Sequence, residues 1–527
     1  MSKENKDFWS NPLLGSKVKS ETVRMPEMLF GYFIGPFGAL LASGIFTSIL
    51  QNYFTDVLKL NLTFLTTLQL VSTILIVAAN LIVGQLIERT GCLAGKARPW
   101  ILLSALTMSV ASVLMFIVPF EGTAKMVWVA IAYNLFYAVA YPIYNTANST
   151  LIPLSTRDSK QRGALASFTN VAGLGVMGAG SMVFPILVSF ALKENQHMWF
   201  LAMLAIAIFG ALTIYLQFLF TRERVTEELR GTAPVKERNG RAAKGINAEE
   251  KAAEGSKAGE EKAAKETKVA GVEKNVQAAP SLGRQLKAVV SEKTWWIVML
   301  FYIGFQWSGA MKNGSMSYFC KWVLDNSFFG NADAWGASQS LLSICGAVPM
   351  ALAAVIVMPL CNRFGKRIVC MIGMLVGAVG GVIAILGNGQ IIPVAIGVAL
   401  KCLGSAPACY VILALLADVI DHIEFKSGIR TDGLTMSIYS SIMVAATPVC
   451  NSIFSALLNM TGYDQSASVA LGTAGQTALA KSAISVSYIW VETVCYVICA
   501  TLIFFFTIEK DLPKEQQEIA ARKKKEA

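Results

Sequence analysis

The segment Phe64–Gly91 reads FLTTLQLVSTILIVAANLIVGQLIERTG. Its first part, Phe64–Ile87, contains no Lys, Arg, Asp or Glu, and it exceeds the roughly 20 residues that a helix needs to cross the hydrocarbon core of a bilayer. Lipid offers the backbone no hydrogen-bonding partner, so a segment of this kind must form a helix. It ends in the pattern Gly84-x-x-x-Glu88-Arg89-x-Gly91. We therefore predict a membrane-spanning helix followed by a tight, charged loop.

The rest of the chain repeats this character. Hydrophobic residues make up 54% of the sequence, 15% of it is charged and its mean hydropathy is +0.53, whereas a soluble domain carries about 25% charged residues. The same criterion of length and charge predicts twelve spans, near residues 29–54, 64–87, 99–119, 126–152, 166–192, 198–220, 295–320, 337–360, 367–387, 391–419, 433–458 and 482–507. We expect an all-α membrane protein with twelve transmembrane helices.

Basic residues gather in alternate loops between these spans. One side of the membrane receives Lys3, Lys6, Lys17, Lys19, Arg24, Arg89, Lys96, Arg98, Arg157, Lys160, Arg162, Arg363, Lys366, Arg367, Arg522, Lys523, Lys524 and Lys525. The opposite loops hold at most one lysine each, such as Lys59, Lys125 and Lys193. Because basic loops stay in the cytoplasm, we predict a multi-pass protein of the plasma membrane with both termini cytoplasmic. The net charge of +11 then requires no nucleic-acid partner.

The composition changes abruptly between the sixth and seventh spans. Residues 242–278 consist largely of Ala, Glu, Lys and Gly, and such a segment buries too little apolar surface to fold alone. We predict a solvated linker; a docking site for a cytosolic regulator is the alternative. The expected organisation is a cytoplasmic segment 1–28, a six-helix bundle 29–220, the charged linker 221–293, a second six-helix bundle 294–507 and a basic tail 508–527.

The two halves echo each other. After the eighth span comes Pro359-Leu-Cys-Asn-Arg363-Phe-Gly365-Lys366-Arg367, at the place that Gly84–Gly91 holds after the second. Both places combine an arginine, a glycine and a basic cluster. Duplicated six-helix halves around a site at the bilayer midplane are a transporter architecture.

Few residues suit catalysis or metal binding. The chain has only two histidines, and its ten cysteines form no CxxC pair or metal-ligand cluster. No spacing typical of a nucleophile, base and orienting group appears in the predicted spans. We therefore predict no cofactor, no metal site, no catalytic residues and no enzymatic activity.

Several longer motifs carry a family resemblance. They are Tyr53-Phe-Thr55-Asp56-Val57 at the end of the first span, Gly84–Gly91 after the second, Gly95-Lys96-Ala-Arg98-Pro99-Trp100 before the third, Leu151-Ile-Pro153 with Arg157–Arg162 after the fourth, and Ala417–Gly433 after the tenth. Together they resemble the glycoside–pentoside–hexuronide:cation symporters of the major facilitator superfamily, of which the melibiose permease is the best-known member. The resemblance implies two six-helix bundles, alternating access, import of a sugar or glycoside and a monomer in the bilayer. It also places Glu88, Arg89 and Arg363 in a cytoplasmic gate.

The family's functional residues are mostly missing at the matching positions. The two cation-binding aspartates of helix two fall at Ile76 and Asn80, and the helix-four aspartate falls at Asn145. The sugar-stacking tryptophan falls at Ser149 and the helix-eleven lysine at Val444. The cation site is therefore unknown, and a proton is the candidate coupling ion. An uncoupled facilitator and a non-transporting sensor are the alternatives.

The fourth span carries a polar stripe. Tyr137, Tyr141, Asn145 and Asn148 recur at spacings of three and four on an otherwise apolar helix. Tyrosine rings pack on the C–H face of a sugar and amides bind its hydroxyl groups. We predict that Tyr141, Asn145 and Asn148 bind the substrate; polar contacts between helices are the alternative.

The family resemblance implies that the first, fourth, seventh and tenth spans line the cavity, and two lysines lie inside these spans. Lys312 and Trp307 belong to the seventh span, and Lys401 lies about eleven residues into the tenth. An intramembrane charge is costly and marks a functional site by default, so all three residues are predicted to bind substrate. Because the first, second and fourth spans offer no acidic partner at mid-depth, the lysines favour an acidic solute such as a uronate, glucuronide or sulfosugar. The alternative is an ion pair within the bundle.

Acidic residues follow at the end of the tenth span. Asp418 and Asp421 are predicted to form gate salt bridges with Arg363 or Arg157. Glu492, inside the twelfth span, is the remaining candidate for a coupling-proton carrier.

Overall fold

The computed structural model describes residues 14–156, 159–229, 282–330, 332–429 and 431–526. The predicted gate residue Arg157, and most of the predicted linker 221–293, lie outside these ranges. The α-helices are α1 Phe37–Asn52, α2 Leu62–Arg89, α3 Arg98–Leu114, α4 Gly122–Asn134, α5 Tyr141–Ser155, α6 Ser159–Leu187, α7 Gln196–Leu219, α8 Arg224–Leu229, α9 Leu282–Val290, α10 Lys293–Trp322, α11 Trp335–Phe364, α12 Lys366–Leu386, α13 Ile391–Ser427, α14 Asp432–Met460, α15 Ala478–Ser485, α16 Val491–Phe504 and α17 Leu512–Glu526. Single π-helical segments extend or join several of them, at Glu27–Ile34, Tyr53–Val57, Leu135–Ala140, Val188–Leu192 and Val486–Trp490. Within the described ranges the fold is helical, and the only β-pairing is an isolated bridge between Cys92 and Gly95.

A helix lies at each of the twelve predicted spans. By length and apolar composition, nine helical stretches of the described chain can cross a membrane, or ten if the bent pair Gly283–Val290 and Lys293–Trp322 forms one span. Two shorter apolar helices, Arg98–Leu114 and Gly178–Leu192, occupy the third and fifth predicted spans.

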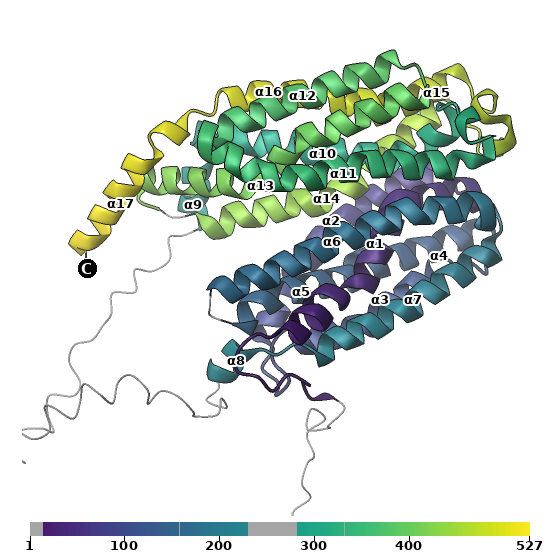
Figure 1. Ribbon diagram of the computed structural model, residues 1–527. Coiled ribbons are helices and arrows are strands. Elements are labelled where there is room, and N and C mark those ends of the chain that lie inside the picture. Colours follow the sequence, from purple (N-terminus) through teal and green to yellow (C-terminus); the bar gives the residue numbers. More distant parts are fainter. Residues whose placement is uncertain (1–13, 157–158, 230–281, 331, 430, 527) are drawn as a thin grey trace, which may run out of the picture.

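The helices form two bundles that lie side by side (Figure 1). The first half contains α1–α7 and the second half contains α10–α16. Across the boundary, α2 packs on α14, α6 on α11 and α1 on α10. The site between the halves is therefore bounded by helices from both.

The internal repeat extends to a matching contact in each half. Glu223, just after α7, accepts hydrogen bonds from the backbone N–H groups of Lys96, Ala97 and Arg98 at 2.7, 2.8 and 2.8 Å. Glu509, just after α16, accepts from the N–H groups at the start of α12, Lys366 and Arg367, at 2.6 and 3.1 Å. In both halves a carboxylate thus holds the N-terminus of the third helix, where free N–H groups and the helix dipole favour a negative charge.

The two ends of the molecule differ. The short helices α8 and α9 and the C-terminal helix α17 lie at one end, which we call the linker end (Figure 1). The opposite end, which we call the distal end, contains the connections 58–61 and 461–477. At the linker end α17 packs on α13, where Nδ1 of His422 lies 2.8 Å from Oε2 of Glu515.

Candidate functional site

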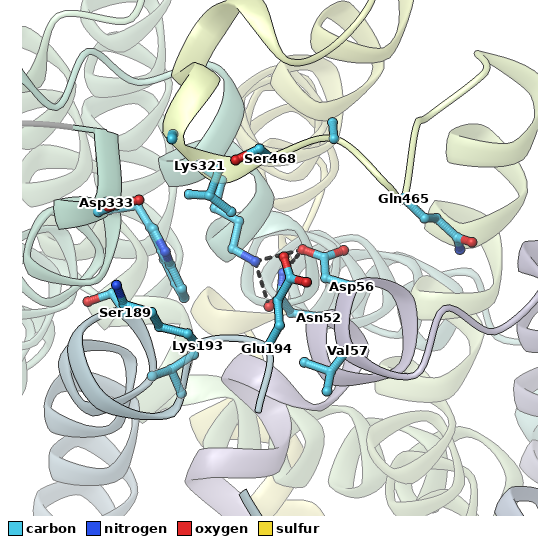
Figure 2. Close-up of a pocket in the computed structure, with 15 residues that line it drawn as sticks. Asn52, Asp56, Val57, Ser189, Lys193, Glu194, Lys321, Asp333, Gln465 and Ser468 are labelled. Atoms are coloured by element: carbon cyan, nitrogen blue, oxygen red, sulfur yellow. Dashed lines mark hydrogen bonds and ion pairs between the residues drawn. The ribbon is translucent and has the colours of Figure 1, made fainter. Parts of the chain in front are cut away.

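A buried ion pair joins the two halves at the distal end. Nζ of Lys321, on α10, lies 2.6 Å from Oδ2 of Asp56 and donates to Oδ1 of Asn52 at 2.8 Å. The ammonium group also lies over the ring of Trp335, 4.7 Å from its centroid. Figure 2 shows these side chains converging from both halves. Taking two charges out of water costs free energy unless they are well paired, so this contact ties α10 to the end of the first span.

Further hydroxyl groups complete the coordination of Asp56. The hydroxyl groups of Thr55 and Tyr463 donate to Oδ1 of Asp56 at 2.7 and 3.0 Å. The hydroxyl oxygens of Thr55 and Tyr318 are 2.6 Å apart. We call this set, Asp56, Lys321 and the groups bonded to them, the distal lock. Thr55-Asp56 belongs to a motif of the family resemblance without a predicted role, and Lys321 was not a predicted site residue. A carboxylate and a lysine at the same ends of the first and seventh spans were the available signal.

The distal lock belongs to a wider closed interface. Nε2 of Gln51 donates to the hydroxyl of Ser455 at 2.6 Å. The hydroxyl of Ser452 donates to the carbonyl of Thr66 at 2.7 Å, and Nε2 of Gln465 donates to the carbonyl of Leu60 at 2.8 Å. These bonds join the distal parts of the two halves. Outside them lies a cavity of about 370 Å³, whose lining includes Lys193, Glu194 and Asp333 together with the lock (Figure 2).

A second cavity, of about 350 Å³, lies between the halves on the linker side of the lock. It is lined by Val77, Asn80, Leu81, Asn145, Thr146, Ser149, Met436, Ser440, Ser441, Met443 and Val444. These residues come from α2, α5 and α14, so both halves contribute. We call it the central cavity. Its lining among the described residues is uncharged: two amides, several hydroxyl groups and aliphatic side chains.

The central cavity gathers positions that the family resemblance assigned separately. Asn80, Asn145 and Val444, where the resemblance places two aspartates and a lysine, all line it. Ile76 is buried, and its carbonyl accepts a hydrogen bond from Nδ2 of Asn80 at 2.8 Å. One of the two positions that the resemblance assigns to the cation site, Asn80, therefore borders this cavity, and the described lining carries no charge. Amides and hydroxyl groups without charge suit a solute rich in hydroxyl groups.

The predicted substrate residues on the fourth span separate into two groups. Asn145 lines the central cavity, and the ring of Tyr141 is half-buried against Phe136, with centroids 6.2 Å apart. Asn148 instead turns into the first half, where its Oδ1 accepts from Nε2 of Gln217 at 2.7 Å. This bond corresponds to the packing alternative, so we leave Asn148 out of the proposed binding set. Trp307 is half-buried, and its indole N–H has no hydrogen-bond partner among the described residues.

Lys312 and Lys401 do have an acidic partner, on a span other than the first, second and fourth. Glu492, on α16, lies between them, with its Oε2 2.5 Å from Nζ of Lys401 and its Oε1 3.4 Å from Nζ of Lys312. Only 2% of the Lys401 side chain is exposed, against 18% for Lys312. The contact joins three separate helices of the second half, so spacing along the sequence could not show it. The ion-pair alternative describes both lysines.

The gate acids have partners other than Arg363 among the described residues, and their other predicted partner, Arg157, lies outside those residues. Asp418 pairs with Lys366 of its own half, and Asp421 accepts from Nε2 of Gln516 on α17 at 2.8 Å. The guanidinium of Arg363 lies over the ring of Phe364, 5.2 Å from its centroid. Arg89 ends α2 and is exposed, and the side chain of Glu88 lies outside the described set. A role of these groups in a closed gate stays a prediction.

The described residues contain no group of three His, Cys, Asp or Glu side chains placed to hold a metal ion.

The sequence matches the family model described as MFS/sugar transport protein over residues 31–248 and 262–510. It is 25% identical over 495 residues to an isoprimeverose transporter of Lactiplantibacillus pentosus, covering 92% of this chain and 89% of that protein. It is 20% identical over 439 residues to a glucuronide carrier protein homolog of Escherichia coli strain K12, covering 82% of this chain and 84% of that protein.

Solved structures show the same fold at low sequence identity. A bacterial homolog of the human lysosomal transporter Spinster aligns with a TM-score of 0.59 at 13% identity, covering 94% of this chain and 99% of that one. The nucleoside transporter NupG aligns with a TM-score of 0.56 at 13% identity, covering 92% and 98%.

Proposed function

This chain belongs to the MFS/sugar transport protein family, and we propose that it imports a neutral sugar or glycoside through the central cavity by alternating access. It is a multi-pass membrane transporter and not an enzyme. The single observation that carries the choice of solute is that the described lining, contributed by both halves, has amides and hydroxyl groups and no charge. A site between two halves can open to either side as the halves rock about it.

The orientation supports import from the distal side. Basic residues gather at the linker end, which by the positive-inside rule is cytoplasmic. The distal lock is then an extracellular gate, closed in this structure. The side chains of Leu81, Ser149 and Ser440, on the linker side of the lock, are exposed. We therefore interpret this conformation as inward-facing.

A neutral solute fits the corrected placement of the lysines. The sequence argument for an acidic sugar required unpaired cations, and Glu492 pairs with both. The similar isoprimeverose transporter is named for a glycoside. An acidic sugar remains the second candidate, because two lysines face one carboxylate and a relative is named for glucuronides.

Competition for uptake distinguishes the two candidates. Cells expressing the protein take up a labelled neutral disaccharide, challenged with its unlabelled form or with the matching uronate. We expect the neutral sugar to compete at lower concentration and Asn145→Ala to weaken that competition. Competition by the uronate alone, lost in Lys312→Gln, would instead establish the acidic candidate.

A further inference from the structure

Three charged side chains meet inside the second half, away from the central cavity. Lys312 of α10, Lys401 of α13 and Glu492 of α16 form the cluster, which we call the charge triad. The hydroxyl of Tyr496 donates to Oε1 of Glu492 at 2.7 Å. Lys401 and Glu492 are each 2% exposed at the side chain. The triad is therefore almost dry.

Close packing of α12 on α13 fixes the depth of Lys401. A Cβ added at Gly380 would lie 2.9 Å from the backbone nitrogen of Lys401, and one added at Gly397 would lie 2.5 Å from the carbonyl oxygen of Gly380. Only glycine allows the two backbones to approach this closely. The backbone of Lys401 is thus packed tightly against α12, and its side chain pairs with Glu492 inside the bundle.

The triad has two lysines and only one carboxylate. Lys401 and Glu492 alone would form a balanced buried pair, and Lys312 adds a second ammonium group. The other titratable side chains facing the triad are Tyr488 and Tyr496 on the last span, Cys402 on α13 and Cys495 on α16. These groups are neutral in their usual state and supply no second negative charge. Among the described residues, the triad with both lysines protonated and Glu492 ionised thus carries a net charge of +1.

A buried net charge is expensive, whereas a balanced cluster is much less so. The triad therefore has two states of distinct cost: a neutral one, with one lysine as a free amine, and a charged one, with both lysines protonated. The interconversion consists of forming or breaking one N–H bond, with the amine lone pair accepting the proton from water and leaving hydroxide, or from hydronium and leaving water. At 18% side-chain exposure, Lys312 is the most exposed of the three residues.

We propose that the charge triad is the coupling site of the transporter and that it binds one proton, shared between the amines of Lys312 and Lys401. It would replace the cation site that the uncharged residues Ile76, Asn80 and Asn145 leave without carboxylates. This inference rests on the proposed transport function. It also provides a mechanical connection, because Lys312 and Lys321 are nine residues apart on α10, about 13.5 Å along the helix axis. A change of charge on α10 therefore acts on the helix that carries the distal lock.

The test compares two activities of purified protein in liposomes. Counterflow, the exchange of labelled for unlabelled sugar, requires no net proton movement. Sugar-driven proton movement is followed with a trapped pH-sensitive dye while sugar flows down an imposed gradient. We expect wild type to show both. Lys312→Met and Lys401→Met each leave one lysine and one carboxylate, so both should keep counterflow and lose the proton signal. Lys287→Met, at an exposed lysine of α9, is the matched control and should keep both activities.

Each result decides the proposal. A wild type with counterflow but without a proton signal would overturn the proposal and leave the transport function intact. If the proton signal of Lys312→Met equals that of wild type, the proposal is also overturned, because the triad then does not bind the coupled proton. If Lys401→Met does not fold, Lys312→Met decides the test. The Lys312 side chain is more exposed than that of Lys401, so its replacement should disturb folding less. Absence of counterflow in wild type would instead contradict the transport function itself.

Discussion

Asn145 lines the central cavity in the structure and was predicted to bind substrate from the sequence. Replacing it with alanine removes one amide and should raise the dissociation constant for the sugar by roughly 2- to 10-fold, since a hydrogen bond contributes about 0.5–1.5 kcal/mol net. Isothermal titration of the purified variant measures this change. Asn362→Ala, at an exposed asparagine of α11, should leave affinity unchanged. An Asn145→Ala protein that is folded and binds as wild type does would show that Asn145 only packs helices.

We predict that transport is independent of sodium, because Ile76 and Asn80 supply no carboxylate where the resemblance places the cation site. Sodium prefers anionic and carbonyl oxygens, and here one residue is aliphatic while the other uses its amide nitrogen to bond the carbonyl of Ile76. We expect the initial rate of sugar uptake to be the same with sodium or choline salts at fixed pH and membrane potential. A steep rise with sodium would require a cation site elsewhere in the chain.

Some contacts of the candidate site could be predicted from the sequence and others could not. A polar stripe at helical spacing identified Asn145, because periodicity reports which face of a helix a residue occupies. The same reasoning included Asn148, whose partner Gln217 lies on another helix. It also left Lys401 without a partner, although Glu492 had been noticed. Which helix faces which is set by tertiary packing, and one sequence carries no direct signal for it.

Between elements, the distal lock predicts how the conformational balance responds. Removing one partner of a buried ion pair costs about 3–5 kcal/mol, and this pair joins the halves only while the distal end is closed. Lys321→Met should therefore shift the population toward a state that is open distally and closed at the linker end. Spin labels at Gln85 of α2 and Asn362 of α11, both exposed, should move closer together in this variant.

Lys481→Met provides the comparison for the lock. Lys481 donates to the carbonyl of Thr473 at 2.8 Å, within the second half, so its loss should leave the label distance unchanged. An unchanged distance distribution in Lys321→Met itself would mean that the lock does not control opening.

The repeated helix caps predict a difference in stability between the halves. Glu223 is 2% exposed and accepts three backbone hydrogen bonds, whereas Glu509 is half-buried and accepts two. Glu223→Gln should lower the free energy of unfolding by about 2 kcal/mol, because bonds to a charged group are worth roughly 1.5–3 kcal/mol. Glu509→Gln should have a smaller effect. Melting temperatures in detergent test the order, and equal or reversed losses would contradict it.

Helix positions were the most predictable elements. Charge-free runs longer than about 20 residues are a strong signal, and each predicted span contains a helix. The π-helical segments, such as Tyr53–Val57 beside the lock, were not predicted. They depend on local hydrogen-bond choices that composition does not determine. The role of Asp56 could therefore not be predicted from the sequence, whereas the structure places it opposite Lys321.

For the whole molecule, the sequence indicated a transporter with two related halves, because a similar loop pattern of arginine, glycine and basic residues follows the second and the eighth spans. The conformation could not be predicted, because both states of an alternating-access protein share one sequence and differ by a small free energy. The structure supplies that information through a lock buried at one end and exposed polar side chains toward the other.

On the proposed function, this chain moves a neutral sugar through a cavity between its halves. Counterflow of a labelled neutral disaccharide in liposomes that contain only this purified protein is the decisive measurement of this activity. We predict exchange well above that of protein-free liposomes, saturable by the unlabelled sugar, and with a higher half-saturating concentration in Asn145→Ala. Exchange no faster than in protein-free liposomes, across a panel of neutral sugars and glycosides, would contradict the proposed function.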